Sequence, residues 1–141
     1  MAGTAIAVHE NSPGCHLIGV EPKQHQMWAQ SLDARERLAF SVPDTIADGQ
    51  QLTTPGELTF PILQRHGLQA VSPDERNIAD TMAWLVDNHK LIAEPSGAIA
   101  LAALLNQPDL IPRGSKVGVF ISGHNIISWR FAKILTQHHT L

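Results

Sequence analysis

The chain has 141 residues, of which 43% are hydrophobic, and ten Lys and Arg against 13 Asp and Glu give it a formal net charge of -3. That length corresponds to one domain or part of one. The charge offers no basic stripe for nucleic acid, no apolar run approaches the roughly 18 residues of a membrane span, and residues 1–10 do not form a signal peptide. We therefore expect a cytoplasmic protein with neither nucleic acid nor membrane as a partner.

The first half of the chain alternates predicted helices and strands. Thr54-Pro55-Gly56-Glu57 has the pattern of a capping box with proline at the first helical position. In chain order we predict a helix over 3–9, a strand over 16–21, a helix over 24–32, a polar connection over 33–42, a helix over 54–66 and a strand over 68–71. Met27, Trp28 and Leu32 are predicted to be packing residues rather than cofactor contacts.

The second half continues the alternation. Ser72-Pro73-Asp74-Glu75 predicts a second capping box, followed by apolar residues at the 3.6-residue period of a half-buried helix. We then predict a strand over 91–93, a central apolar helix over 97–105, a strand over 116–121 buried on both faces and a closing helix over 126–137. The alternation predicts one α/β unit, residues 1–141, with three layers in which helices flank a mostly parallel sheet.

Polar residues follow two of these predicted strands directly. The last strand breaks into Ser122-Gly123-His124-Asn125, and in open α/β sheets ligands bind beyond the carboxyl ends of the strands. The Ser122 hydroxyl could therefore bond an aromatic heteroatom, or could simply cap the next helix. Glu94 precedes Pro95 and points toward the same crevice, unless it only interacts with the helix terminus, which is worth about 0.3 to 1 kcal/mol.

Four motifs together carry a resemblance to a known family. They are Leu17–Pro22, Asp44–Gly49 with Pro55–Phe60 behind it, Ala93–Ala98 and Val119–Asn125. In this order and spacing, the stretch from about Ala2 to Leu135 closely resembles the second half of the threonine/serine dehydratase and serine racemase family. These are pyridoxal phosphate enzymes of fold type II, similar to the tryptophan synthase β subunit, and the resemblance implies part of their large domain.

The resemblance implies four cofactor contacts in this chain. Ser122 matches the family serine that bonds the pyridine nitrogen of pyridoxal phosphate, and Glu94 matches a glutamate near the cofactor ring. Gly49 and Gly123 match glycines at the cofactor face, although Asp48-Gly49 alone is a plain turn signal. A neutral serine does not hold a proton strongly on the ring nitrogen, which suits loss of a β-hydroxyl group.

Two positions depart from the family pattern. Glu21 matches the first ligand of a divalent-metal site, but the two further ligand positions are His25 and Met27. A hard cation takes oxygen ligands, so the Met27 thioether argues against a metal, and the alternative is that Glu21 simply ends its strand. His124 stands where the family usually has a small residue; it could narrow the pocket, contact the substrate or point to solvent.

The family's Schiff-base lysine, in a Ser-Xaa-Lys segment, and its glycine-rich phosphate loop have no counterpart here. None of Lys23, Lys90, Lys116 and Lys133 has that context, so we assign no catalytic residue, and Met1-Ala2-Gly3 resembles the residues after the phosphate loop. The resemblance therefore implies a carboxy-terminal portion of an ammonia-lyase that acts on a small β-hydroxy amino acid such as threonine or serine. No regulatory domain is expected after the last helix.

Alone, the chain is expected to be inactive. A homo-oligomer or a complementing amino-terminal half are the expected partners. The alternatives are a noncatalytic subunit or interaction module, and a serine racemase or another fold-type-II enzyme such as a cysteine synthase. The Asp-Gly and Glu-Pro-Ser-Gly-Ala motifs favour the dehydratase branch over the cysteine synthases.

Overall fold

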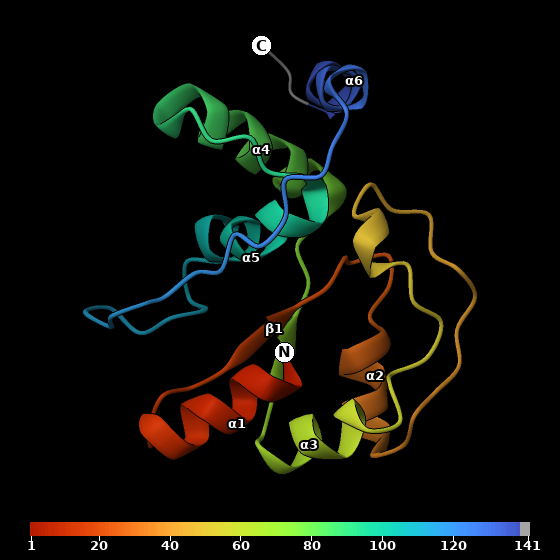
Figure 1. The fold of residues 1–141 in the computed structure, drawn as a ribbon, viewed down its shortest axis with the longest axis vertical. Helices are drawn as coiled ribbons and strands as arrows, with labels where there is room; N and C mark the ends of the chain where they lie inside the picture. Colours follow the sequence, from red (N-terminus) through yellow and green to blue (C-terminus); the bar gives the residue numbers. More distant parts are fainter. Residues whose placement is uncertain (139–141) are drawn as a thin grey trace.

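The computed structural model describes residues 1–138, and residues 139–141 of the predicted unit lie outside the described part. It confirms an α/β arrangement of helices around a parallel sheet (Figure 1). In chain order the elements are α1 (Ala2–Asn11), β1 (Ile18–Val20), α2 (Met27–Ala34), the 3-10 turn η1 (Asp48–Gln50), α3 (Thr59–Arg65), β2 (Gln69–Val71), α4 (Glu75–His89), α5 (Pro95–Asn106) and α6 (Ser128–His138). None of the helices described is both long and apolar enough to cross a membrane.

The sheet consists of β1 and β2, which run parallel with Ile18 opposite Gln69 and Val20 opposite Val71. A parallel pair needs a long crossover connection, and residues 21–68, including α2 and α3, provide it. The ladder continues one residue further, because Glu21 N donates to Val71 O at 3.0 Å. The two strands predicted in the first half of the chain are thus confirmed, at three residues each.

In Figure 1, α4, α5 and α6 lie above the sheet, and α1 and α3 lie below it. Each of these two parts contains a cluster of buried side chains. The upper group joins α4, α5 and α6, and includes Ile78, Ala79, Met82, Leu85, Ala98, Ile99, Ala102 and Ile134. The prediction that α5 is central is confirmed, since much of its surface is buried against α4. In the lower group Trp28 and Leu32 pack against Ala5, Leu63 and Leu68, which confirms their predicted packing role.

Both predicted capping boxes were wrong in detail. α4 is capped by Asp74 rather than Ser72: Asp74 Oδ1 accepts from Asn77 N at 2.9 Å, and Asn77 Oδ1 accepts from Asp74 N at 3.4 Å. α3 begins only at Thr59. The Glu57 carboxylate pairs with Arg37 at 3.5 Å instead of reaching back to Thr54, so residues 54–58 form a turn ahead of the helix.

The predicted strands over 91–93 and 116–121 are not strands in this structure. A strand needs a neighbour that pairs with its backbone, and within residues 1–138 only β1 and β2 form such a ladder. Residues 116–121 run past α5 as an irregular trace, and Phe120 is 73% exposed rather than buried (Figure 1). The two segments meet at their carboxyl ends, where Glu94 N donates to Gly123 O at 3.0 Å.

Candidate cofactor site at the start of α5

The first turn of α5 is the centre of the candidate site. Pro95 occupies the beginning of the helix, where its missing N–H costs nothing, and the extended backbone of Glu94 is the N-cap. Gly97 N and Ala98 N both donate to the Glu94 carbonyl at 2.9 Å. The half-buried Glu94 side chain makes no capping hydrogen bond, so its carboxylate remains available to other groups.

Gly123 packs directly onto this turn. A Cβ atom on Gly97 would lie 2.7 Å from Gly123 N and 3.0 Å from Gly123 C, which are backbone atoms with little freedom to move. A Cβ atom on Gly123 would lie 2.7 Å from the carboxyl carbon of Glu94. Glycine at both positions therefore allows the backbone of 122–123 to lie against the start of α5, with the Glu94 carboxylate over Gly123 and the exposed Ser122 next in the chain.

Gly49 reaches the same turn through Ser96. Gly49 N donates to Ser96 Oγ at 3.0 Å, and a Cβ atom on Gly49 would lie 2.9 Å from that oxygen. The structure thus brings Gly49, Glu94 and Gly123 around one helical turn. Ser96 belongs to the motif that carried the family resemblance, but nothing in the sequence identified its partner, which is 47 residues away.

The segment that carries Gly49 is anchored by two further side chains that sequence reasoning missed. Glu75 accepts from Thr45 Oγ1 at 2.6 Å and from Ile46 N at 2.8 Å. Arg130 Nη1 pairs with the Asp48 carboxylate, and Arg130 Nη2 donates to Ile46 O at 3.2 Å. These contacts join α4 and α6 to the loop of residues 45–48, which is distant in sequence, and no local motif predicts them.

Glu21 has a structural role that goes beyond ending β1. It is 5% exposed, and its carboxylate accepts from Trp28 N and Ala29 N, both at 2.8 Å, so it satisfies two amides at the start of α2. Burial raises the pKa of Glu21, while the hydrogen bonds from Trp28 and Ala29 and the proximity of His25 act to lower it. Among residues 1–138 no three His, Cys, Asp or Glu side chains are grouped to hold a metal ion.

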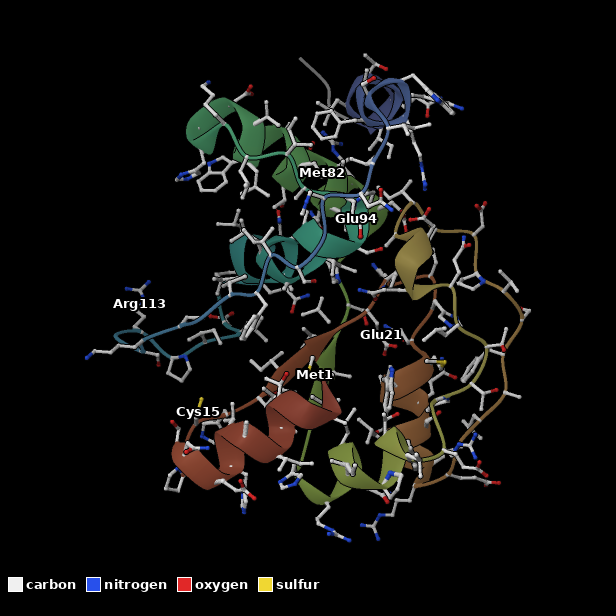
Figure 2. All side chains as sticks on the ribbon, in the orientation of Figure 1. Met1, Cys15, Glu21, Met82, Glu94 and Arg113 are labelled. Carbon is white, nitrogen blue, oxygen red and sulfur yellow. The ribbon has the colours of Figure 1, made fainter. Side chains whose placement is uncertain are left out.

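A cavity of about 230 Å³ lies beside the site, between β1 and the η1 region. Its lining includes Met1, Glu21, Trp28 and Gly49, but not Ser122 or Glu94. Figure 2 shows Met1 and Glu21 in the middle of the molecule, with Glu94 above them at the start of α5. Gly49 therefore borders both the cavity and the turn that carries Glu94.

The chemistry of the gathered groups fits the ring of pyridoxal phosphate but not its covalent attachment. Ser122 provides an exposed hydroxyl that can donate or accept, Glu94 provides a carboxylate not used for capping, and the glycines leave room for a flat group. All four lysines are exposed, and Lys90 Nζ bonds Asp87 O at the end of α4. His124 is exposed.

The sequence is similar to a protein family and to several characterised enzymes. Residues 1–123 match the profile of a family described as "Pyridoxal-phosphate dependent enzyme". The L-threo-3-hydroxyaspartate ammonia-lyase of Saccharomyces cerevisiae is 32% identical over 96% of this chain, and the serine racemase of Dictyostelium discoideum is 36% identical over 96% of it.

The solved structures that resemble this chain are of the same kinds of enzyme. The T.th. threonine deaminase superimposes with a TM-score of 0.85 over 89% of this chain at 33% identity, and maize serine racemase with 0.83 over 99% at 31% identity. The chain spans only 41% of the yeast relative and 46% of the threonine deaminase chain.

Proposed function

Because the chain belongs to the family of pyridoxal-phosphate dependent enzymes, we propose that it supplies the ring side of the cofactor site in an ammonia-lyase that acts on a small β-hydroxy amino acid. The observation that carries the proposal is the convergence of Gly49, Glu94 and Gly123 on the first turn of α5, with Ser122 beside them. As one unit over residues 1–141, the chain corresponds to a carboxy-terminal portion of the large domain.

Each residue has a defined role in this proposal. The Ser122 hydroxyl would bond the ring nitrogen of the cofactor, Glu94 would contact the ring, and Gly49 and Gly123 would let the ring approach the backbone. When bound, pyridoxal phosphate supplies an electron sink for the bond-breaking steps at the amino acid. A neutral serine does not stabilise a proton on the ring nitrogen as a carboxylate would, and this favours loss of the β-hydroxyl group.

We further propose that a complementing amino-terminal half supplies the lysine and the phosphate loop. The surface that would receive it consists of residues 91–92 and 116–121, called here the open edge. It carries the exposed apolar side chains Leu91, Ile92, Val117, Phe120 and Ile121. An apolar segment that has no strand beside it among residues 1–138 is suited to pairing with a strand from another chain.

Racemisation of serine is a second candidate function. It is favoured by the 36% identity to a Dictyostelium serine racemase, which is as high as the similarity to the ammonia-lyases. Product analysis separates the two: an ammonia-lyase forms a 2-oxo acid from serine, whereas a racemase forms D-serine.

The proposal is tested by measuring pyridoxal phosphate absorbance and 2-oxo acid formation from threonine, serine and threo-3-hydroxyaspartate. The chain is assayed alone and mixed with the part of the yeast ammonia-lyase that lies outside the match. We expect turnover only in the mixture, and less of it with Ser122→Ala. Turnover by the chain alone would refute the need for a partner, and a stable mixture without cofactor binding would refute the proposed site.

The open edge is tested in the same mixture. Phe120→Asp places a charge on an edge side chain that is 73% exposed, and Leu58→Asp does so at an equally accessible position, 82% exposed, outside the edge. Phe120→Asp should not alter the stability of the chain alone, and Leu58→Asp should leave it unchanged or raise it slightly, because Leu58 is the N-cap of α3, where aspartate is preferred. We expect Phe120→Asp to weaken association at least tenfold and Leu58→Asp to have little effect; equal effects would argue against this surface.

A further inference from the structure

We infer that Arg130 of α6 is a positioning residue for the cofactor site, acting through the segment of residues 45–49 that ends in Gly49. The inference rests on the function proposed above, because it concerns the placement of one of that site's glycines. Arg130 does not touch the site itself. It holds the residues directly before Gly49.

The geometry of Arg130 suits this task. One guanidinium nitrogen, Nη1, pairs with the carboxylate of Asp48, and the other, Nη2, donates to the carbonyl of Ile46 at 3.2 Å. A planar guanidinium fixes two acceptors relative to each other, which a lysine ammonium does less well. Arg130 therefore restrains the backbone from Ile46 to Asp48.

Two other helices hold the ends of the same segment. Glu75 of α4 holds Thr45 and Ile46 through bonds of 2.6 and 2.8 Å, and Ser96 of α5 accepts from Gly49 N at 3.0 Å. If Arg130 is removed, the stretch between these two anchors loses its polar contacts with α6. Gly49 is then held by its hydrogen bond to Ser96 and, through the preceding residues, by Glu75 and the packing of Ala47.

α6 is itself well placed to link both sides of the site. Its Ile134 is buried in the core shared with α4 and α5, so the backbone that carries Arg130 is fixed by packing. α6 also follows closely after Ser122 and Gly123 in the chain. One helix thus terminates the segment that carries Ser122 and holds the segment that carries Gly49.

Amide hydrogen exchange of the chain tests the local part of the inference. The amides of residues 46–50 all donate hydrogen bonds, to Glu75, Thr45, Ile46, Ser96 and Ala47 respectively, so their exchange reports on this segment. With Arg130→Met we expect exchange at 46–50 to accelerate about tenfold, with a smaller change for Arg130→Lys, while the amides of α4 keep their rates. Arg113→Met removes the same charge from an exposed loop away from the site, and should change nothing at 46–50 (Figure 2).

The affinity for pyridoxal phosphate is the second readout, and it would not change if Arg130 served only the stability of the fold. In the complemented mixture we expect Arg130→Met to weaken pyridoxal phosphate binding severalfold, Arg130→Lys to recover part of the loss, and Arg113→Met to match the wild type. Unchanged exchange at 46–50, equal acceleration throughout α4, or faster exchange with unchanged cofactor affinity would each overturn the inference. Absence of cofactor binding by the wild-type mixture would instead count against the proposed function, and the exchange data would still decide whether Arg130 holds the segment.

Discussion

Glu21 and Glu94 each stand directly before a proline and shortly before a helix, yet their carboxylates have different partners. Glu21 is buried and accepts two amide hydrogen bonds at the start of α2. Glu94 is half-buried at the start of α5, makes no capping bond and lies against Gly123. The first carboxylate is used by the fold, and the second remains available for a ligand.

The difference comes from the segment that meets each helix. At α5 a second chain segment arrives with a glycine, Gly123, and occupies the space over the first turn. At α2 the helix begins six residues after Glu21, so the carboxylate can reach back to the amides of Trp28 and Ala29. The same dipeptide therefore serves stability in one place and a candidate site in the other.

The largest expected effect concerns the contact between Gly97 and Gly123, which lies beside Glu94 at the start of α5. Gly97→Ala places a methyl group against the backbone of Gly123, at distances of 2.7 and 3.0 Å from two of its atoms. We expect the free energy of unfolding, measured by urea denaturation, to fall by about 1 to 3 kcal/mol. Gly123→Ala should cost less, because its methyl group meets the Glu94 side chain, which can move.

Gly3→Ala is the matched control for this prediction. Gly3 lies in the first turn of α1, and a Cβ atom there would meet nothing within 4 Å. Alanine is the better helix former by about 1 kcal/mol, so this change should stabilise the chain or leave it unchanged. If Gly97→Ala behaved like Gly3→Ala, the close approach of residue 123 to α5 would be contradicted.

A smaller effect separates the two glutamates directly. Glu21→Ala leaves the amides of Trp28 and Ala29 without their acceptors, and we expect a loss of about 1 to 2 kcal/mol in the free energy of unfolding. Glu94→Ala removes no capping bond, so the change should stay within about 0.5 kcal/mol. Equal losses in thermal or urea unfolding would show that the two carboxylates have the same structural role.

The sequence predicted the helices and the paired strands better than the contacts between residues that are distant in the chain. The helix of α5 and the pairing strands could be read from apolar periodicity, and family motifs pointed to Glu94, Gly49 and Gly123. Residues 116–121 were predicted to be buried because they are as apolar as a buried strand, but burial also requires a neighbouring strand, and none is present among the described residues. The anchors Ser96 and Arg130 depend on contacts 47 and 82 residues apart, which no local pattern encodes.

The smallest predicted effect is a difference in pH dependence between wild type and Glu21→Gln. Burial raises the pKa of Glu21 above its ordinary value of 4.5 in the folded chain, so the folded state holds this proton more tightly than the unfolded state. The stabilisation from that proton is fully present below about pH 4.5 and is lost as the pH rises through the folded-state pKa.

Glutamine cannot titrate, so the variant has no such loss. Its unfolding free energy minus that of the wild type should therefore rise across this window and then level off, on top of a constant offset for the changed hydrogen bonds. Urea unfolding of both proteins at a series of pH values from about 4 to 8 measures the difference directly, because the other carboxylates titrate alike in both. A difference that stays flat would mean that the hydrogen bonds from Trp28 and Ala29 offset the effect of burial on the pKa of Glu21. A difference that falls as the pH rises would mean that these hydrogen bonds outweigh burial and lower the pKa.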